Sequence, residues 1–202
     1  MNQPVVILDA DGVFLRTVRP GNYLEHRYGL SAGQIAGFKK FMSRCLVGKA
    51  DLKPELPRFL REWGIPETTE MFLDEAFGSG CEIDESVADV VRGLRHDGVF
   101  CGLATNQDKH RMRYLDQRLA IRGFFDATFV SCELGVKKPD AEFFQSVRAA
   151  LPRKTLAFWD DRPENVQAAK ECSWSAFVFE NAAMFSAEVK NLLETGSDNN
   201  DP

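Results

Sequence analysis

Apolar residues along the chain follow two spacings, one typical of buried strands and the other of helices. Five short apolar runs, rich in β-branched or aromatic residues, predict strands at 5–9, 100–104, 127–131, 156–159 and 176–179. Apolar positions three and four residues apart predict helices between them, at 87–96, 109–119, 141–151 and 163–171. Because strands and helices alternate from Ser86 onward, we expect an α/β fold: a Rossmann-like, doubly wound parallel sheet between two layers of helices (α/β/α).

The segment between the first strand and Asp84 shows helical spacing alone. Its apolar positions predict helices at 35–46, 54–63 and 67–77, separated by proline and glycine residues. We therefore expect an α-helical unit of residues 17–83, inserted into a core of residues 1–16 and 84–194.

Charged and polar residues stand directly after three of the predicted strands. They form three pairs: Asp9 and Asp11, Thr105 and Asn106, and Asp160 and Asp161. Since ligands of open α/β sheets bind beyond the carboxyl ends of the strands, we expect these pairs to meet at one site. Two carboxylates only two residues apart repel each other, and this cost is explained if a cation neutralises them and one of them reacts.

Each of these residues also has an ordinary structural explanation when it is considered alone. Thr105 suits the N-cap of the helix near 109, and Asp160 and Asp161 suit the cap of the helix that opens at Pro163. Lys138, considered alone, would be a solvated lysine in a loop. Taken together, in their order along the chain, these residues favour a shared site.

Four motifs carry a resemblance to a known family. They are DADGV at 9–13, LATN at 103–106, KKPD at 137–140 and FWDDRPENV at 158–166. In these motifs, and over nearly its whole length, the chain resembles the haloacid dehalogenase-like (HAD) superfamily. The resemblance implies a phosphatase in which residues 17–83 form a mobile helical cap. Dehalogenases of the superfamily lack an acid at the place of Asp11, so the resemblance argues against dehalogenation.

The resemblance implies a role for each residue that would act on a phosphate monoester. Asp9 would be the nucleophile and would form an aspartyl-phosphate. Asp11 would be the general acid that protonates the leaving oxygen, and then the base that activates water. Thr105 and Asn106 would bind the phosphoryl group, and Lys138 would neutralise charge on that group and on Asp9.

The resemblance also implies a magnesium site. Asp9, the backbone carbonyl of Asp11, and Asp160 would bind Mg²⁺, and Asp161 would act through water or hold the other ligands in place. The expected substrate is a small phosphorylated metabolite, of the sugar phosphate or nucleotide type. Two alternatives stay open: a sugar phosphomutase of the same family, and a non-catalytic binding or regulatory protein that retains the fold.

The inserted segment offers candidates for movement and for specificity. Gly78 and Gly80 make its second junction a candidate hinge, because glycine tolerates large backbone rotations. The polar or aromatic residues in or near it that could contact a substrate are Arg16, Tyr23, Arg44, Lys49 and Trp63.

Composition narrows the expected partners and location. The net charge of −5, without a basic stripe, argues against binding to nucleic acid. No apolar stretch is long enough to span a membrane, and the run at 5–8 is too short for a signal peptide. Five scattered cysteines fit reduced thiols in a cytoplasmic protein. The polar residues 195–202 predict a disordered tail, and nothing in the pattern predicts a particular oligomeric state.

Overall fold

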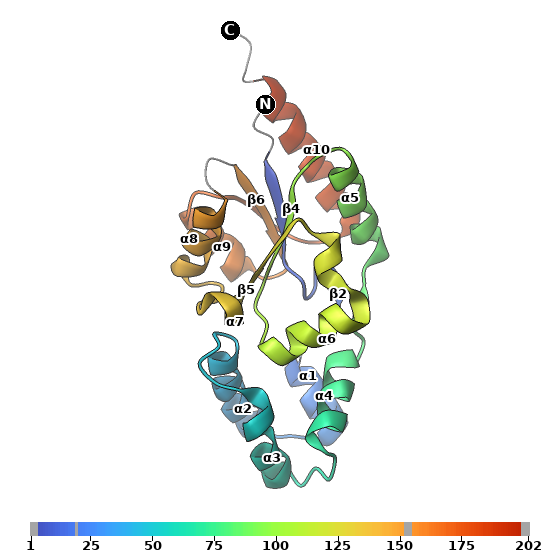
Figure 1. The fold of residues 1–202 in the computed structure, drawn as a ribbon, viewed down its shortest axis with the longest axis vertical. Helices are drawn as coiled ribbons and strands as arrows, with labels where there is room; N and C mark the ends of the chain where they lie inside the picture. Colours follow the sequence, from blue (N-terminus) through green and yellow to red (C-terminus); the bar gives the residue numbers. More distant parts are fainter. Residues whose placement is uncertain (1–3, 19, 152–154, 199–202) are drawn as a thin grey trace.

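A five-stranded parallel sheet forms the centre of the computed structural model, which describes residues 4–18, 20–151 and 155–198 (Figure 1). Its strands stand in the order β5 (Ala127–Val130), β4 (Cys101–Thr105), β1 (Val5–Leu8), β6 (Leu156–Asp160) and β7 (Ser175–Val178). The central strand pairs in register with both neighbours, so that Leu8 lies opposite Leu103 and Trp159. Every strand end lies within one residue of its predicted position, and the predicted fold class is confirmed.

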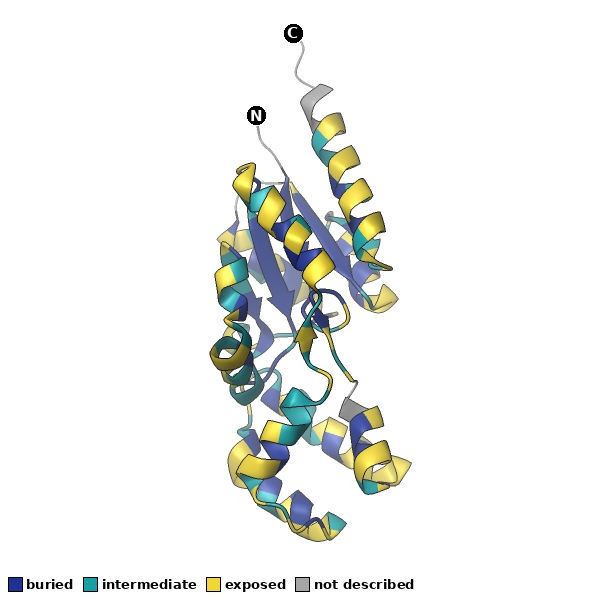
Figure 2. Ribbon diagram, turned by 90° about the vertical axis from the view of Figure 1, so that its right-hand side faces the viewer, coloured by how far each residue is buried: buried dark blue, intermediate teal, exposed yellow. Residues whose placement is uncertain are grey.

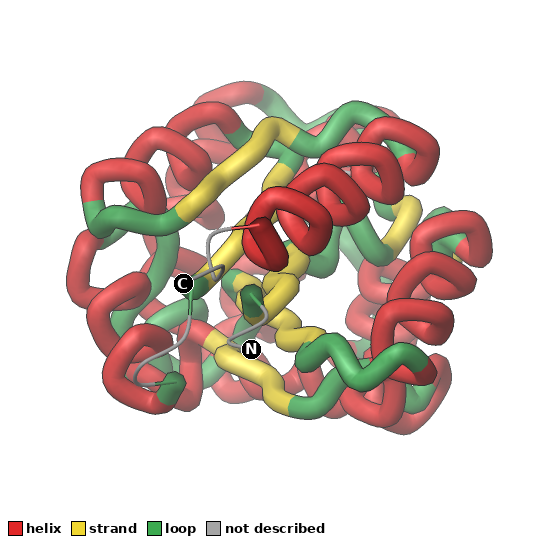
Figure 3. The backbone as a smooth tube through the Cα atoms, turned by 90° about the horizontal axis from the view of Figure 1, so that it is seen from above, coloured by secondary structure: helices red, strands yellow, loops and turns green. Residues whose placement is uncertain are grey.

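Helices cover both faces of this sheet (Figures 1 and 3). One face carries α5 (Glu85–His96), α6 (Lys109–Leu119), the 3₁₀ helix η1 (Ile121–Phe124) and α10 (Ala182–Asp198). The other face carries α8 (Ala141–Ala150) and α9 (Pro163–Glu171), with the short α7 (Ser131–Leu134) beside β5. Alternate residues of β1 supply both cores, because successive side chains of a strand point to opposite faces.

Helix α10 is an element that our sequence pattern did not predict. Its residues Phe185 and Val189, four apart, are buried on the sheet, and the Phe185 ring lies 5.1 Å from that of Trp159. The Trp159 indole N–H donates to Glu188 at 2.7 Å. The helix continues through residues 195–198, where we predicted the start of a tail. Residues 199–202 lie outside the described residues.

Four helices gather at one end of the molecule, away from the sheet (Figures 1 and 2). They are α1 (Pro20–Tyr28), α2 (Ala32–Cys45), α3 (Leu52–Trp63) and α4 (Thr69–Gly78). The last three correspond to the helices predicted at 35–46, 54–63 and 67–77, and side-chain N-caps open each of them. Their apolar faces form a core of their own around Phe38, Phe59 and Phe72. We propose that these helices are the cap, and we call them the proposed cap.

The two connections between the proposed cap and the sheet domain run side by side. Strands β2 (Leu15–Arg16) and β3 (Glu82–Ile83) pair antiparallel, and the Arg16 guanidinium lies 3.0 Å from Asp84. Gly80 has a φ of +61°, which favours glycine, and Gly78 lies at the end of α4 against Tyr114. A Cβ at Gly78 would come within 2.7 Å of the Tyr114 hydroxyl, so this glycine allows α4 to approach α6 closely.

Candidate active site

The chain turns back sharply where β1 ends, and this turn places Asp9. The Asp9 N–H donates to the carbonyl of Trp159 at 2.9 Å, which continues the pairing with β6. Oδ1 of Asp9 accepts from the N–H of Ala10 at 2.7 Å. Gly12 has a φ of +81°, and a Cβ there would lie 2.6 Å from Oδ2 of Asp161. The backbone conformation therefore favours glycine, and a side chain at this position would displace that of Asp161.

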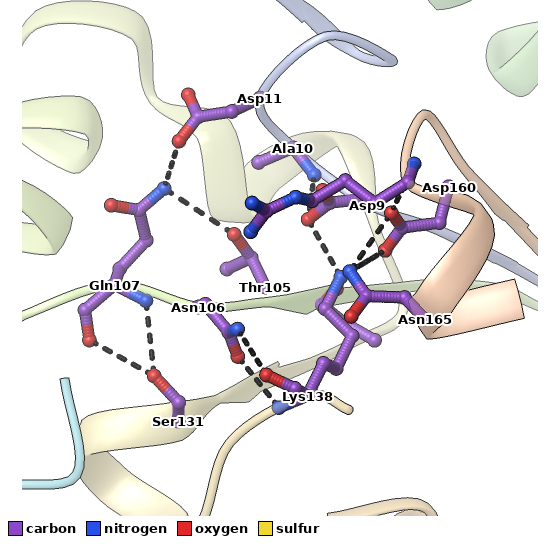
Figure 4. A network of polar contacts seen from close by, with 12 residues as sticks. Asp9, Ala10, Asp11, Thr105, Asn106, Gln107, Ser131, Lys138, Asp160 and Asn165 are labelled. Atoms are coloured by element: carbon purple, nitrogen blue, oxygen red, sulfur yellow. Dashed lines mark hydrogen bonds and ion pairs between the residues drawn. The ribbon is translucent and has the colours of Figure 1, made fainter. Parts of the chain in front are cut away.

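Lys138 joins three strands at the carboxyl edge of the sheet (Figure 4). Its Nζ lies 2.9 Å from Oδ1 of Asp9 and 2.6 Å from Oδ2 of Asp160, and it donates to the carbonyl of Ala104 at 2.7 Å. Its side chain is 1% exposed, so its charge is neutralised by buried partners rather than by water. Burial by itself lowers the pKa of Lys138, but the Asp9 and Asp160 charges outweigh that effect and raise it.

Asp9 has an unusual environment for a carboxylate. Burial raises its pKa to about 7; Lys138 opposes this shift, while Asp160 and Asp11 add to it. A perturbed carboxyl group in a polar cluster at the end of a strand is typical of a functional site.

Asp160 is held from several sides, and two more carboxylates lie close to it. Asn165 donates through Nδ2 to both Asp160 oxygens at 2.9 Å, and the Arg162 N–H donates to Oδ1 at 2.9 Å. Oxygens of Asp9, Asp160 and Asp161 all lie within 4.8 Å of one another. The structure thus brings together the carboxylate side chains that the sequence predicts for a metal site. Our predictions gave Asn165 no site role, although its place in the fourth motif was visible.

Two residues of the second motif, Thr105 and Asn106, complete the cluster. Thr105 is 1% exposed, and its Oγ1 accepts from Gln107 Nε2 at 3.3 Å. The Asn106 side chain bonds to the backbone of Lys138 in both directions: Nδ2 donates to the carbonyl at 2.8 Å, and Oδ1 accepts from the N–H at 2.9 Å. These bonds make the Asn106 side chain a support for Lys138. The predicted binding of phosphate by Asn106 stays a prediction.

Asp11 lies apart from this cluster and faces two residues that the sequence analysis missed. Figure 4 shows its carboxylate directed toward Gln107, which donates through Nε2 to Oδ2 at 2.7 Å. Arg111 donates from Nη1 to Oδ2 at 2.6 Å and from Nη2 to Oδ1 at 2.9 Å. Burial by itself raises the pKa of Asp11, but the Arg111 charge and these hydrogen bonds outweigh it, so the pKa lies below its usual range.

A cavity of about 370 Å³ lies between the proposed cap and the start of α6. Its lining comes from the end of α2, the loop at 48–52, the residues 108–110, and Cys132. At its edge Asp51 contacts Lys109 Nζ at 2.7 Å and His110 Nε2 at 2.6 Å. These hydrogen bonds lower the pKa of Asp51 to about 2. The lining includes Asp108, two residues after the second motif in the chain, but not Asp9, Thr105, Lys138 or Asp160.

The structure places the five candidates for substrate contact in different environments. Lys49 lines the cavity, and Arg44 is exposed but is not among the lining residues. Tyr23 and Trp63 pack in the aromatic core of the proposed cap, and Arg16 pairs with Asp84 in the connection to the sheet. Lys49 is therefore the candidate that the structure favours.

The sequence model of the haloacid dehalogenase-like hydrolases matches residues 4–173. The chain belongs to this family. The four motifs and the parallel sheet are therefore features of the HAD fold, and the family predicted from the sequence is confirmed.

Two curated relatives of this HAD chain are named as a hydrolase and as a phosphatase. Flavin mononucleotide hydrolase 1 of Arabidopsis thaliana, named as a chloroplast protein, is 34% identical over 122 residues, which are 59% of this chain and 49% of that protein. A sesquiterpene phosphatase of Aspergillus oryzae is 27% identical over 121 residues, 57% of this chain and 60% of that protein. The matches thus span only about half to three fifths of each relative. The predicted cytoplasmic location stays a prediction.

Solved structures share the fold of this HAD chain. A HAD family enzyme of Bacteroides thetaiotaomicron, solved as a magnesium complex, has a TM-score of 0.75 and 17% identity, with 89% of this chain and 94% of that chain covered. A HAD-like hydrolase of Porphyromonas gingivalis has a TM-score of 0.73 and 21% identity, with 96% of this chain and 98% of that chain covered.

Among the described residues, none of the helices combines the length and the apolar character needed to cross a bilayer.

Proposed function

We propose that this HAD hydrolase is a Mg²⁺-dependent phosphatase that cleaves small phosphate monoesters through an aspartyl-phosphate. The observation that carries the proposal is the buried cluster of Asp9, Lys138 and Asp160 at the carboxyl edge of the sheet. The names of the two curated relatives support it, since both act on phosphorylated compounds.

The side chains suit a reaction in two steps. In the first, an oxygen of Asp9 bonds to phosphorus and the bond from phosphorus to the ester oxygen breaks. Asp11, once it has turned from Arg111 and taken up a proton, would give that proton to the leaving oxygen. In the second, Asp11 takes a proton from water, whose oxygen bonds to phosphorus and releases phosphate and the free Asp9 carboxylate. Lys138 and Thr105 would stabilise the charge on the phosphoryl oxygens in both steps.

Asp9, Asp160 and Asp161 fit the cation that the family implies. Each offers a carboxylate oxygen within 4.8 Å of the others, and oxygen ligands are what Mg²⁺ prefers. The missing side chain at Gly12 leaves room for Asp161 beside the first motif. The backbone carbonyl of Asp11 is a further expected ligand. When bound, Mg²⁺ would reduce the repulsion between these carboxylates and a phosphate dianion.

The cavity beside the second motif is the place that we propose for the leaving group. Asp108, which follows Thr105 by three residues in the chain, and Lys49 of the proposed cap both line it. Its volume of about 370 Å³ suits a small metabolite. The substrate class is thus a small phosphorylated metabolite, of the sugar phosphate or nucleotide type.

Hydrolysis of p-nitrophenyl phosphate tests the proposal. We expect turnover with Mg²⁺, its loss in excess EDTA, and its recovery when Mg²⁺ is returned. The variant Asp9→Asn, purified in the same way, controls for contaminating phosphatases and should be inactive. Full activity in metal-free buffer would contradict the metal dependence, and equal activity of Asp9→Asn would contradict the site.

A further inference from the structure

Lys137 is a partly buried cation that the reaction described above does not use. Its Nζ donates to the hydroxyl of Ser43 at 2.6 Å, and among the described residues no carboxylate forms an ion pair with it. Its neighbour Lys138, by contrast, lies between Asp9 and Asp160. A lysine ammonium has three N–H donors, and a partly buried charge without a counter-charge loses hydration without compensation. Lys137 therefore has a positive charge available for an anion.

The position of Ser43 offers a structural explanation for this contact when it is considered alone. Ser43 lies in the last turn of α2, and the carbonyl end of a helix attracts cations. That attraction is equivalent to only about half a charge, and it falls off within the last turn. It accounts for the contact of Lys137 with α2, but it does not neutralise the lysine.

The cavity between the proposed cap and α6 contains a second lysine without a carboxylate partner. Lys49 lines this cavity, is exposed, and forms no ion pair with any residue of the described chain. The two acids of the lining are already engaged. Asp51 contacts Lys109 and His110. Asp108 accepts from backbone N–H groups in the first turn of α6. Lys49 therefore brings a positive charge to the lining that no acid of the cavity offsets.

The end of α2 brings the two lysines to the same junction between the proposed cap and the sheet domain. The Lys49 N–H donates at 2.9 Å to the carbonyl of Arg44, the residue that follows Ser43. The loop that carries Lys49 also lies against α7, because a Cβ at Gly48 would lie 2.7 Å from a carbonyl oxygen of that helix. Lys137 follows α7 by three residues, so the same two segments hold both lysines (Figure 1).

We propose that Lys49 and Lys137 form a subsite for a second anionic group of the substrate. The substrate class is then a phosphate monoester whose alcohol part carries its own negative charge, on a carboxylate or on a further phosphate. This inference rests on the proposed function, because it needs the phosphoryl group to be bound and cleaved at Asp9. The two lysines do not act on that group, so their loss should weaken only the esters with an anionic alcohol part.

Alkyl phosphates of two to six carbons test the subsite when their far ends carry a carboxylate, a phosphate, a hydroxyl or an amine. The range of lengths covers the reach to the lysines, and the first two ends distinguish the two kinds of anion. The wild type should prefer anionic ends to the hydroxyl end, and the hydroxyl end to the amine. Lys49→Gln and Lys137→Gln each remove one charge and keep a polar side chain. Each should lower kcat/KM for the preferred anionic ester by about 10-fold, the lower end for a hydrogen bond to a charged group, and leave the hydroxyl-ended ester within about twofold.

Matched variants separate the subsite from general effects of charge and folding. Arg44→Gln changes an exposed cation at the same end of α2, outside the cavity lining, and should change no preference. The ratio of variant to wild type for each ester cancels the intrinsic reactivity of that ester. If Lys137→Gln does not fold, as judged by its thermal transition, Ser43→Asp places a fixed carboxylate beside Lys137 and should cause the same selective loss.

The outcomes distinguish this inference from the proposed function. Equal losses for every chain end, or a loss in Arg44→Gln that matches those of the lysine variants, would overturn the subsite while the phosphatase stands. A wild-type preference for the hydroxyl or the amine end would do the same, and a selective loss confined to one lysine would overturn the pairing of the two. A wild-type protein that hydrolyses none of the esters would overturn the proposed function and this inference with it.

Discussion

The two sides of the proposed active site are held together in opposite ways. On the sheet side, Lys138 and Asp160 have side chains that are 1% and 0% exposed. On the cap side, Asp51 and Lys109 pair with side chains that are 37% and 56% exposed. Water and salt screen the second pair far more than the first, and exposed pairs contribute about 0–1 kcal/mol.

This contrast indicates that the two sides of the proposed site have different functions. The buried cluster fixes the groups that would act on the phosphoryl group, which every phosphate ester shares. The exposed contact lies on the part that would meet the leaving group, which differs between esters. Substitutions on the two sides should therefore fail in different ways.

Replacing Lys138 should have the largest effect of the three substitutions that compare the two sides. Lys138→Met leaves Asp9 and Asp160 buried without their cation, which costs about 3–5 kcal/mol of unfolding free energy when a buried pair is broken. Turnover of every ester should fall alike, because the phosphoryl group is common to all. Urea unfolding and a panel of phosphorylated metabolites measure the two effects. A change in the order in which the esters are preferred would contradict the proposed difference in function between the two sides.

Replacing Asn165 should have an intermediate effect, confined to the metal. Asn165→Ala removes both Asn165 bonds to Asp160 and leaves that carboxylate held by Lys138 and the Arg162 N–H. Residues that orient metal ligands typically contribute 10- to 100-fold in affinity, so the Mg²⁺ concentration for half-maximal activity should rise by about that factor. Gln167→Ala, an exposed residue on the same helix, is the control. Unchanged Mg²⁺ dependence in Asn165→Ala would argue against Asp160 as a ligand.

Replacing Lys49 should have the smallest effect on the overall rate. It should have the largest effect on which phosphate esters are preferred. Lys49→Ala changes the lining of the cavity but no buried contact of the sheet domain, so the ranking of esters should shift while the Mg²⁺ dependence stays constant. Arg44→Ala is the matched control, because the described structure places Arg44 on the surface outside that lining. Parallel losses on all esters for Lys49→Ala would count against the cavity as the leaving-group site.

The sequence alone predicts the parts of this molecule whose signals are local. Strand ends, most helices and the motif residues follow from short apolar runs and from the polar residues next to them. The pairing of Arg111 with Asp11, 100 residues apart, carries no such signal, because it depends on how α6 packs against the first-motif turn. The role of Asn106 as a support for Lys138 depends in the same way on two loops meeting. Helix α10 was not predicted, although Phe185 and Val189 have helical spacing, and only residues 195–202 at its end were assigned, as a tail.

The most direct test of the account is to find the residue that takes up phosphate. The wild-type protein is mixed with p-nitrophenyl phosphate and Mg²⁺, quenched in acid within milliseconds, and digested for peptide mass spectrometry. The account predicts one added phosphoryl group on the peptide that contains Asp9, and none when the same experiment uses Asp9→Asn. A phosphoryl group on another residue, or the same label in Asp9→Asn, would contradict the central claim that Asp9 is the nucleophile.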